Sequence, residues 1–430
     1  MSGVSPEVSE SSPAVFYTKG IHKHMEVKIY SKTSCSYCVK AKEFFKDHKI
    51  PFEEIVLDDY NERQEFYQRV SNGKQVTSVP QIFIDDKHIG TYTDLLNQEH
   101  LILKKEFGGL EESSITYKPF RYPWAVEMAQ NHEKIHWIAD EISLEDDVHE
   151  WKSNKLTQGE KDFIRSVLTL FVQSDVNVGE NYINYYLRIF KNNEIRKMLT
   201  SFASREFIHQ ESYSLFNDTM GFPESEYSAF LEIEEMREKH DFMLDIDIHT
   251  KEGKGLSIAK SVINEGLVLF SSFAMLLNFQ RFGKLKGFGK VNEFSLRDEN
   301  LHALGMAKLF RTYCNENPRI VNDDFKKKIY SMFRTAIKLE DEFIERAFSF
   351  FSPEGLTKEE MKLYIRYMAD RRLIQLGLRG NFKVKENPLS WIDHIVNAPD
   401  HQNFFEGRVA SYVVAGLTGQ FDYDFMEEPA

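Results

Sequence analysis

The sequence predicts a multidomain protein in which a small α/β domain precedes a larger all-α helical bundle. Strand-like and helix-like patterns alternate over residues 24–108, whereas most of the later chain repeats its apolar residues with the period of amphipathic helices. The motif Glu-x-x-His occurs twice in these helical stretches, at Glu206 and His209 and again at Glu299 and His302. Residues three apart share a helix face, so two such helices facing each other can direct their carboxylates and imidazoles to a pair of metals.

Bulk composition limits the classes of protein that this chain can be. Its 430 residues, 42% hydrophobic and 28% charged, are typical of a globular protein with two or three domains. A formal net charge of −13 argues against nucleic acid or an anionic membrane surface as the main partner. The chain has no uninterrupted apolar run of about 18 residues and no signal-peptide pattern, so we expect a cytoplasmic protein.

The α/β domain is expected over residues 24–108. Residues 1–23 are rich in Ser, Glu and Pro and lack an apolar period, which predicts a disordered tail. The pattern that follows predicts the order β-α-β-α-β, with strands at 27–30, 52–57 and 81–84 and helices at 33–46 and 61–70.

A Cys-x-x-Cys motif, Cys35 and Cys38, lies at the start of the first of these helices. The helix dipole and the positive charge of Lys32 favour a thiolate at Cys35, and Cys38 can displace a mixed disulfide formed there. The alternative is half of a zinc site, but the chain has no second Cys pair and Cys314 is distant in sequence. The motif therefore favours thiol-disulfide chemistry in a reducing compartment.

This region resembles the glutaredoxin family, which has the thioredoxin fold. Cys35-Ser36-Tyr37-Cys38 is close to the family's Cys-Pro-Tyr-Cys, and Thr77-Ser78-Val79-Pro80 matches a loop whose proline would be cis beside the active site. Gly90-Thr91-Tyr92-Thr93-Asp94 lies where the family binds glutathione, with Gly-Thr in place of the usual Gly-Gly. The resemblance implies that glutathione is held by Lys32, Thr77, Val79, Pro80 and Asp94.

A linker is expected at residues 109–120, where the pattern breaks into short Gly, Glu and Ser pairs. The bundle is then expected over residues 121–400. Its predicted helices cover residues 125–141, 158–190, 193–217, 225–245, 255–283, 291–314, 322–348 and 357–378.

Two further acids lie within apolar helical stretches of the bundle. Asp175 follows the apolar run 163–172, and Glu265 opens the apolar run 266–277. An unpaired carboxylate there would cost several kcal/mol or take up a proton, and coordination to a metal removes that cost. A lone Glu-x-x-His is common on solvated helix faces, but two copies with two embedded acids fit a ferritin-like dimetal-carboxylate bundle.

The helical region resembles the radical-generating small (beta) subunit of class I ribonucleotide reductase over most of residues 120–415. Residues 206–213 look like the family's Glu-x-x-His-x-x-x-Tyr motif and residues 296–302 like its Arg-Asp-Glu-x-x-His motif, with further matches at 367–378 and 387–391. The resemblance implies a dinuclear metal centre whose ligands are Asp175, Glu206, His209, Glu265, Glu299 and His302.

The same resemblance implies roles for four more residues. Tyr213, one helical turn beyond His209, would carry a tyrosyl radical, and Trp137 with Asp298 would form an electron route from the site, Asp298 orienting His209. Tyr412 would relay the radical between subunits. The flexible tail at 401–430 interleaves acidic and aromatic residues, which suggests a segment that folds onto the large subunit. Simple packing of Tyr213 and Trp137, and a merely flexible terminus, are the alternatives.

We therefore predict the small subunit of class I ribonucleoside-diphosphate reductase, an enzyme of deoxyribonucleotide synthesis that works with a separate large (catalytic) subunit. We expect a homodimer in which the fused glutaredoxin acts as a glutathione-dependent reductant. A ferritin-like dimetal monooxygenase with a redox domain is the alternative function, and an iron-storage or redox-chaperone protein is a third. Two irons are expected, but Mn/Mn or Mn/Fe suits the same ligands, and a need for a flavoprotein activase stays open.

Overall fold

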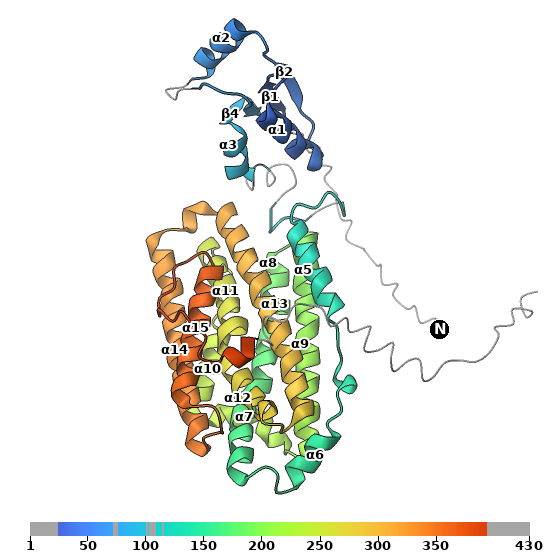
Figure 1. The fold of residues 1–430 in the computed structure, drawn as a ribbon, viewed down its shortest axis with the longest axis vertical. Coiled ribbons are helices and arrows are strands. Elements are labelled where there is room, and N and C mark those ends of the chain that lie inside the picture. The colour runs from blue at the N-terminus through green and yellow to red at the C-terminus, as the bar shows by residue number, and fades with distance from the viewer. Residues whose placement is uncertain (1–24, 72–75, 100–101, 103–108, 114–115, 394–430) are drawn as a thin grey trace, which may run out of the picture. The chain divides into compact units, whose positions relative to one another are not determined.

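The computed structural model describes residues 25–71, 76–99, 102, 109–113 and 116–393. The chain divides into two compact units, residues 1–106 and residues 107–430. Figure 1 shows the first, in blue, as a small sheet with helices, and the second as a bundle of long helices. The α/β-then-all-α fold class predicted from the sequence is confirmed.

The first unit is a four-stranded sheet with the strand order β2-β1-β3-β4. β1 pairs in parallel with β2 and antiparallel with β3, so the buried side chains of Ile29 and Ile82 lie opposite each other at the centre of the sheet. The bounds are β1 (Val27–Ser31), β2 (Glu53–Val56), β3 (Gln81–Ile84), β4 (Lys87–Gly90), α1 (Ser36–Asp47), α2 (Tyr60–Val70) and α3 (Tyr92–Asn97).

The sequence did not predict β4. This strand is short and polar, Lys87-His88-Ile89-Gly90, and lies at the edge of the sheet. Asp85 and Asp86 connect it to β3 with φ angles of 49° and 59°, the left-handed conformation that tight hairpin turns use. A turn without Gly or Asn and a strand without apolar alternation explain why the hairpin left no clear pattern.

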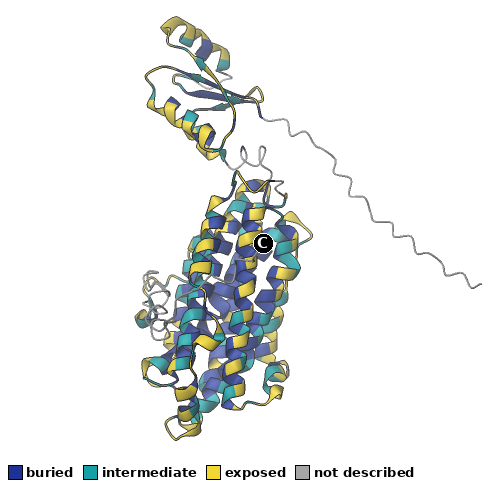
Figure 2. Cartoon of the chain, turned by 90° about the vertical axis from the view of Figure 1, so that its right-hand side faces the viewer, coloured by how far each residue is buried: buried dark blue, intermediate teal, exposed yellow. Residues whose placement is uncertain are grey.

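The second unit is built from long helices around one apolar core, and Figure 2 shows the buried residues of these helices in dark blue. α7 packs against α9, α11 against α13, and α5 against α9. The helices are α5 (Pro123–Lys134), α6 (Glu145–Lys152), α7 (Gln158–Asn181), α8 (Leu187–Ile189), α9 (Asn193–Met220), α10 (Glu234–Leu244), α11 (Lys251–Ile263), α12 (Phe270–Arg281), α13 (Lys286–Glu316), α14 (Asp323–Phe350) and α15 (Lys358–Gln375).

Four of the predicted helices are interrupted, which corrects the sequence-based boundaries. The stretch 125–141 ends its α-helix at Lys134, and the stretch 225–245 begins as a 3-10 helix, Glu224–Glu232, before α10. The other two contain π-helical turns, Tyr182–Tyr186 after α7 and Asn264–Val268 between α11 and α12. A π turn inserts one residue without changing the apolar character of the stretch, so periodicity alone did not detect it.

Capping residues explain where α7 and α9 begin, two helices that carry residues of the candidate site described below. Thr157 and Glu160 form a capping box at the start of α7, and the Asn192 side chain accepts hydrogen bonds from the first turn of α9. Gly221 ends α9 with φ 78°, a left-handed conformation that glycine adopts without strain. These caps fix the register in which α7 and α9 present their side chains to the core.

Residues at the predicted linker pack onto the helical unit. Leu110 is 1% exposed, and its carbonyl accepts hydrogen bonds from the backbone N–H groups of Lys191 and Asn192. The buried Glu316 carboxylate accepts hydrogen bonds from the Leu110 N–H and from Arg121. The helical unit therefore begins before residue 121, where the sequence placed its start.

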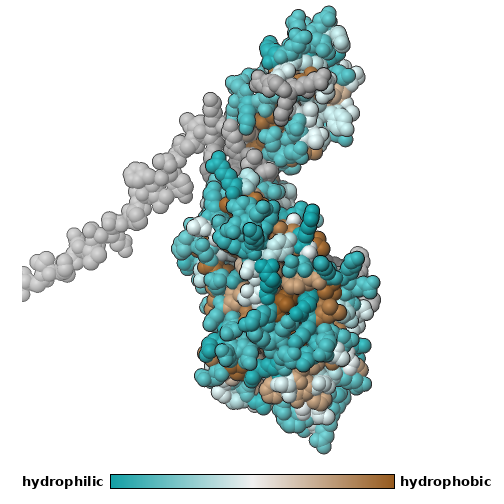
Figure 3. Space-filling model, turned by 90° about the vertical axis from the view of Figure 1, so that its left-hand side faces the viewer, coloured by the Kyte–Doolittle hydropathy of each residue, from teal (hydrophilic) through white to brown (hydrophobic). Residues whose placement is uncertain are grey.

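One helical stretch, Lys251–Arg281, is long and apolar enough to cross a membrane by length and composition. Its most apolar window is wholly buried inside the bundle, as expected of the central helix of a folded core. On the face of the helical unit that Figure 3 shows, apolar side chains form brown areas between hydrophilic ones. Scattered exposed apolar side chains of this kind are normal for a globular protein.

Candidate metal centre and thiol site

The structure brings all six sequence-predicted ligands together at the centre of the bundle, where each is at most 1% exposed. Four separate segments supply them. α7 carries Asp175, the π turn Asn264–Val268 carries Glu265, α9 carries Glu206 and His209, and α13 carries Glu299 and His302.

The six side chains form two overlapping groups. Asp175, Glu206, His209 and Glu299 form one group, and Glu206, Glu265, Glu299 and His302 form the other. Within each group, one donor atom per residue lies within 4.8 Å of the others. Because Glu206 and Glu299 belong to both groups, the six residues could hold two ions, and these two carboxylates could serve both.

The buried donor atoms of these residues fit a metal pair. Both carboxylate oxygens of Asp175 make no hydrogen bond among the described residues, while Nδ1 of His302 lies 2.9 Å from Glu206 and Nδ1 of His209 lies 3.1 Å from Glu299. Buried polar atoms are nearly always paired, so such a cluster calls for an ion. Oxygen and imidazole donors suit iron and manganese, and the four carboxylates would balance the charge of two divalent cations.

Proton affinities in the cluster support the same interpretation. Burial alone would lower the pKa of His302, but nearby carboxylates, Glu206 first, outweigh it and raise the pKa well above the ordinary value. Burial raises the pKa of Glu265 to about 7. The metal-free cluster therefore holds protons, which bound metal ions would displace.

Glu265 is held in place by two hydroxyl groups. Ser261, one turn earlier on α11, donates to its Oε1, and Tyr182 donates to its Oε2 at 2.5 Å. Tyr182 belongs to the π turn after α7, and Glu265 to the π turn after α11. Two π turns thus meet at one ligand, as such turns often do at functional sites.

On the other side of the centre, Asp298 connects His209 to Trp137. Its Oδ2 atom accepts from Trp137 Nε1 at 2.7 Å and lies 3.3 Å from Nε2 of His209. Arg205 donates to the same oxygen at 2.9 Å. Although burial opposes it, the Arg205 guanidinium holds the pKa of Asp298 far below the ordinary value, so the residue stays a carboxylate.

The end of α5 explains why Trp137 can reach Asp298. Helix carbonyls at a C-terminus lack partners within the helix. Here Arg205 and Arg297 donate to the carbonyl of Ile135 at 3.2 Å and 2.9 Å, so the helix stops at Lys134. The chain then turns away from the helical path and places the fully buried Trp137 indole beside Asp298.

Tyr213 is fully buried, one helical turn beyond His209 on α9. Among the described residues its hydroxyl makes no well-formed hydrogen bond, although the side chain of Ser295 interacts with it. Burial, and then the charge of Asp175, raise the pKa of Tyr213 well above the ordinary value, while Ser295 acts in the opposite direction. The phenol is therefore neutral and screened from water beside the metal centre.

A third histidine, not predicted from the sequence, contacts the centre. His132 on α5 is fully buried, and its Nε2 atom lies 3.0 Å from Nε2 of His302. Its Nδ1 atom lies 2.8 Å from the Ser201 hydroxyl, which donates to Glu133 at 2.5 Å. Burial lowers the pKa of His132 well below the ordinary value, which keeps this imidazole neutral.

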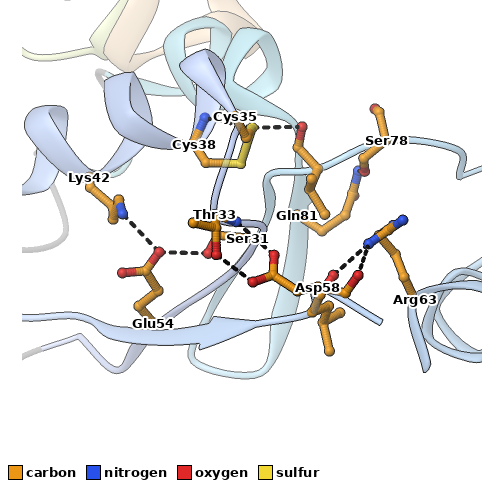
Figure 4. Close-up of a disulfide and its surroundings, with 12 residues drawn as sticks. Ser31, Thr33, Cys35, Cys38, Lys42, Glu54, Asp58, Arg63, Ser78 and Gln81 are labelled. Atoms are coloured by element: carbon orange, nitrogen blue, oxygen red, sulfur yellow. Dashed lines mark hydrogen bonds and ion pairs between the residues drawn. A yellow bond between two sulfur atoms is a disulfide. The ribbon is translucent and has the colours of Figure 1, made fainter. Parts of the chain in front are cut away.

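The first unit contains the thiol site, shown in Figure 4. Cys35 is the N-cap residue of α1, and its sulfur forms a disulfide with Cys38 and accepts from the Cys38 N–H at 3.1 Å. Cys38 is 1% exposed, whereas Cys35 is partly exposed and lies 3.6 Å from the carbonyl oxygen of Val79. The accessible sulfur is thus the one at the helix N-terminus.

Of the residues expected to bind glutathione, Val79 has a contact with the thiol site. The predicted cis bond before Pro80 is confirmed, and Val79 contacts Cys35, while Lys32 and Thr77 are exposed. The Asp94 carboxylate accepts hydrogen bonds from the N–H and hydroxyl of Thr91, which start α3.

Comparison with known proteins decides the family. Residues 114–388 match the family model described as ribonucleotide reductase, small chain, and residues 27–89 match the glutaredoxin model. The chain belongs to the ribonucleotide reductase small-chain family. It is 37% identical over 327 residues to the probable ribonucleoside-diphosphate reductase small subunit 048L of Invertebrate iridescent virus 3, covering 72% of this chain and 86% of the viral protein.

Solved structures agree with this assignment. The ribonucleotide reductase R2 subunit of Clostridium botulinum is 25% identical with a TM-score of 0.59, covering 64% of this chain and 89% of that one. The dimanganese(II) protein NrdF of Streptococcus sanguinis shares the fold at 20% identity with a TM-score of 0.56, covering 66% and 98% of the two chains.

The chain is thus a class I ribonucleoside-diphosphate reductase small subunit with a fused glutaredoxin domain, and the monooxygenase alternative is not favoured. Small subunits of this family work with a large subunit and are commonly dimeric. Tyr412 and the tail 401–430 lie outside the described residues.

Sequence reasoning missed several polar residues that support the ligands, namely Arg205, His132, Ser201, Ser261 and Tyr182. One signal was available for Arg205, because the buried acid Asp298 requires a cation and Arg205 lies directly before Glu206 in an apolar helix. Ser261 lies four residues before Glu265, which is the spacing of a helix neighbour. His132 and Tyr182 approach from other segments, and no local pattern reveals such contacts.

Proposed function

We propose that the six clustered residues hold a dinuclear metal centre that generates a radical on Tyr213. The observation that carries this proposal is the pair of overlapping ligand groups that share Glu206 and Glu299. The fully buried Tyr213 lies one helical turn beyond His209, a member of the first group. The bound metals would supply the oxidising power, after activation by oxygen. Tyr213 would lose one electron and one proton, and the surrounding apolar core would protect its radical from water.

Two irons are our preferred metals, because a tyrosine that carries the radical is present beside the ligands. Manganese is the second candidate, since oxygen and imidazole donors suit both metals. The Streptococcus sanguinis protein of the same fold is described as a dimanganese(II) form, which supports manganese as the second candidate.

The hydrogen-bonded series from His209 through Asp298 to Trp137 supplies an electron route in this proposal. Asp298 also fixes His209, because it accepts a hydrogen bond from Nε2 while Nδ1 faces the metal site. From Trp137 the radical would pass to the large subunit by way of Tyr412 in the C-terminal tail, which would bind that subunit. We propose a cytoplasmic location for the assembled enzyme.

Electron paramagnetic resonance tests the radical assignment. The full chain is loaded anaerobically with Fe(II) and then exposed to oxygen; a tyrosyl signal is expected from the wild type and not from Tyr213→Phe, with both metals retained. Tyr364→Phe is the matched control, since Tyr364 is also fully buried with an unpartnered hydroxyl. An unchanged signal in Tyr213→Phe would place the radical on another residue.

We further propose that the glutaredoxin domain reduces the large subunit with electrons from glutathione. Each turnover oxidises a thiol pair in that subunit, and this chain cannot be the catalytic subunit because its only cysteine outside Cys35 and Cys38 is Cys314. Glutathione would be held by Lys32, Thr77, Val79, Pro80 and Asp94. Because both units share one chain, docking of the small subunit raises the effective concentration of Cys35 near its target.

Turnover with glutathione as the sole reductant tests this second proposal. Wild-type protein combined with the large subunit should sustain many turnovers, whereas Cys35→Ser should stop when the stored thiols are used. Cys314→Ser serves as the control and should behave as wild type. Equal sustained turnover by Cys35→Ser, without added thioredoxin or glutaredoxin, would refute it.

A further inference from the structure

We propose that His132 is a positioning residue for His302, and that an imidazole nitrogen in place of a carboxylate as hydrogen-bond acceptor makes the Glu265/His302 half of the metal centre the weaker-binding half. This inference rests on the proposed metal centre. It concerns His132, Ser201 and Glu133, which are not among the ligands or on the route through Trp137.

The direction of each hydrogen bond follows from the geometry. The Nδ1 atom of His302 faces Glu206, Glu265 and Glu299, at 2.9, 3.4 and 3.7 Å. If this nitrogen binds a metal, the proton of the neutral ring is on Nε2, which must donate to Nε2 of His132. His132 then carries its proton on Nδ1 and donates to Ser201, and Ser201 donates to Glu133.

This series fixes the His302 ring from outside the centre. A ligand imidazole is normally oriented by the partner of its other nitrogen. His132 is itself held by Ser201 at 2.8 Å and by an edge contact with Phe202 at 5.2 Å between ring centroids. Glu133, at the far end, is exposed in a surface hollow of about 570 Å³ that Arg196 and Lys197 also line.

The two ligand histidines therefore have acceptors of different chemistry. Nε2 of His209 faces the carboxylate of Asp298 at 3.3 Å, whereas Nε2 of His302 faces an imidazole nitrogen at 3.0 Å. A carboxylate partner makes an imidazole a stronger donor to a metal than a neutral partner does. The group of Asp175 and His209 should consequently fill first, and the group of Glu265 and His302 second.

Anaerobic titration of the metal-free full chain with Mn(II) alone tests this proposal, with free Mn(II) followed by electron paramagnetic resonance. We expect wild type to bind two ions in two steps. His132→Leu should weaken the second step by about 10- to 100-fold and leave the first within about threefold. His132→Gln should recover most of the second step, because an amide can accept from His302 and donate to Ser201.

Two further variants separate positioning from general damage to the fold. Tyr313→Phe removes a hydrogen bond to the Lys251 carbonyl elsewhere in the bundle and should leave both steps unchanged. Ser201→Ala keeps His132 but removes its support, so it should weaken the second step severalfold, which tests the idea even if His132→Leu does not fold. Circular dichroism and the melting temperature report folding of each variant.

Distinct results would overturn the inference and its premise. The positioning role fails if His132→Leu binds both ions as wild type does, if it weakens both steps equally, or if His132→Gln is as impaired as His132→Leu. A folded Ser201→Ala with an unchanged second step would also overturn it. Failure of the wild type to bind two ions would instead refute the proposed metal centre.

Discussion

At the residue scale, we expect the six proposed ligands to contribute unequally to metal binding. Glu206 belongs to both ligand groups, whereas Asp175 belongs to one. We expect Glu206→Ala to lose both metals and Asp175→Ala to retain one, because the other group keeps its ligands. Metal content per chain, measured by mass spectrometry after loading with Mn(II) and desalting, distinguishes the two. Both variants should keep the helical circular dichroism spectrum, since the core is mostly apolar.

Glu180→Ala is a suitable control, because Glu180 is an exposed acid on α7 close to Asp175 in sequence. Full metal occupancy in Glu206→Ala would contradict its assignment as a shared ligand. Loss of both metals in Asp175→Ala would show that the two groups do not fill independently.

Cys314 is chemically different from the other two cysteines. It lies in α13, and burial raises the pKa of its thiol to about 12. At pH 8 it therefore stays protonated and unreactive, since the thiolate is the nucleophile. After reduction of the native protein, iodoacetamide should label Cys35 first and leave Cys314 unlabelled until the protein is denatured. Peptide mass spectrometry measures both, and rapid native labelling of Cys314 would contradict this expectation.

At the scale of helices, α10 and α14 are joined by a buried ion pair. Lys239 Nζ lies 2.6 Å from Glu340 Oε1, both side chains are at most 2% exposed, and Ser271 donates to the other carboxylate oxygen. Removing one partner leaves a buried charge. Lys239→Met should therefore lower the free energy of unfolding by about 3–5 kcal/mol. Chemical denaturation measures this change.

The double variant Lys239→Met/Glu340→Leu should recover most of that loss, because no charge stays buried. The single variant should also respond to pH. Burial raises the pKa of Glu340 above 4.5, and Lys239 opposes that rise, so without Lys239 the folded state holds the proton to a higher pH than the unfolded chain. Stability should then fall as the pH increases above about 4.5. A double variant no more stable than the single one would contradict this account.

The sequence predicted most of the long helices but not where they are interrupted, and it did not predict the short helices α3 and α6. Apolar periodicity predicted the stretches that form α7 and α9, and the two Glu-x-x-His motifs with Asp175 and Glu265 predicted the residues that the structure brings to one centre. The sequence did not predict that α5 ends at Lys134, because the hydrogen bonds at this helix end come from Arg205 and Arg297, which belong to other helices. Tertiary contacts of this kind also explain why His132 and Tyr182 were not foreseen.

At the scale of the whole molecule, the family is commonly dimeric, and α9 exposes two large apolar side chains. Phe207 is 49% exposed and Leu215 is 36% exposed, and their spacing of eight residues keeps them close to one face of the helix. We expect Phe207→Glu to shift the protein from dimer to monomer in light scattering after gel filtration. Leu363→Glu on α15, with a similarly exposed side chain, should remain dimeric. A dimeric Phe207→Glu variant would place the interface elsewhere.

The buried stretch Lys251–Arg281 has a consequence for biosynthesis. It is apolar enough to pass for a membrane span, and it packs against α13, α14 and α15, which leave the ribosome later. While translation passes this point, the nascent chain presents a hydrophobic segment before the helices that cover it exist. We expect chains truncated after α12 to be captured by chaperones or by membrane-targeting factors. Capture of the truncated chain, and its absence once residues 286–375 are also synthesised, would be measured by crosslinking stalled ribosome–nascent chain complexes.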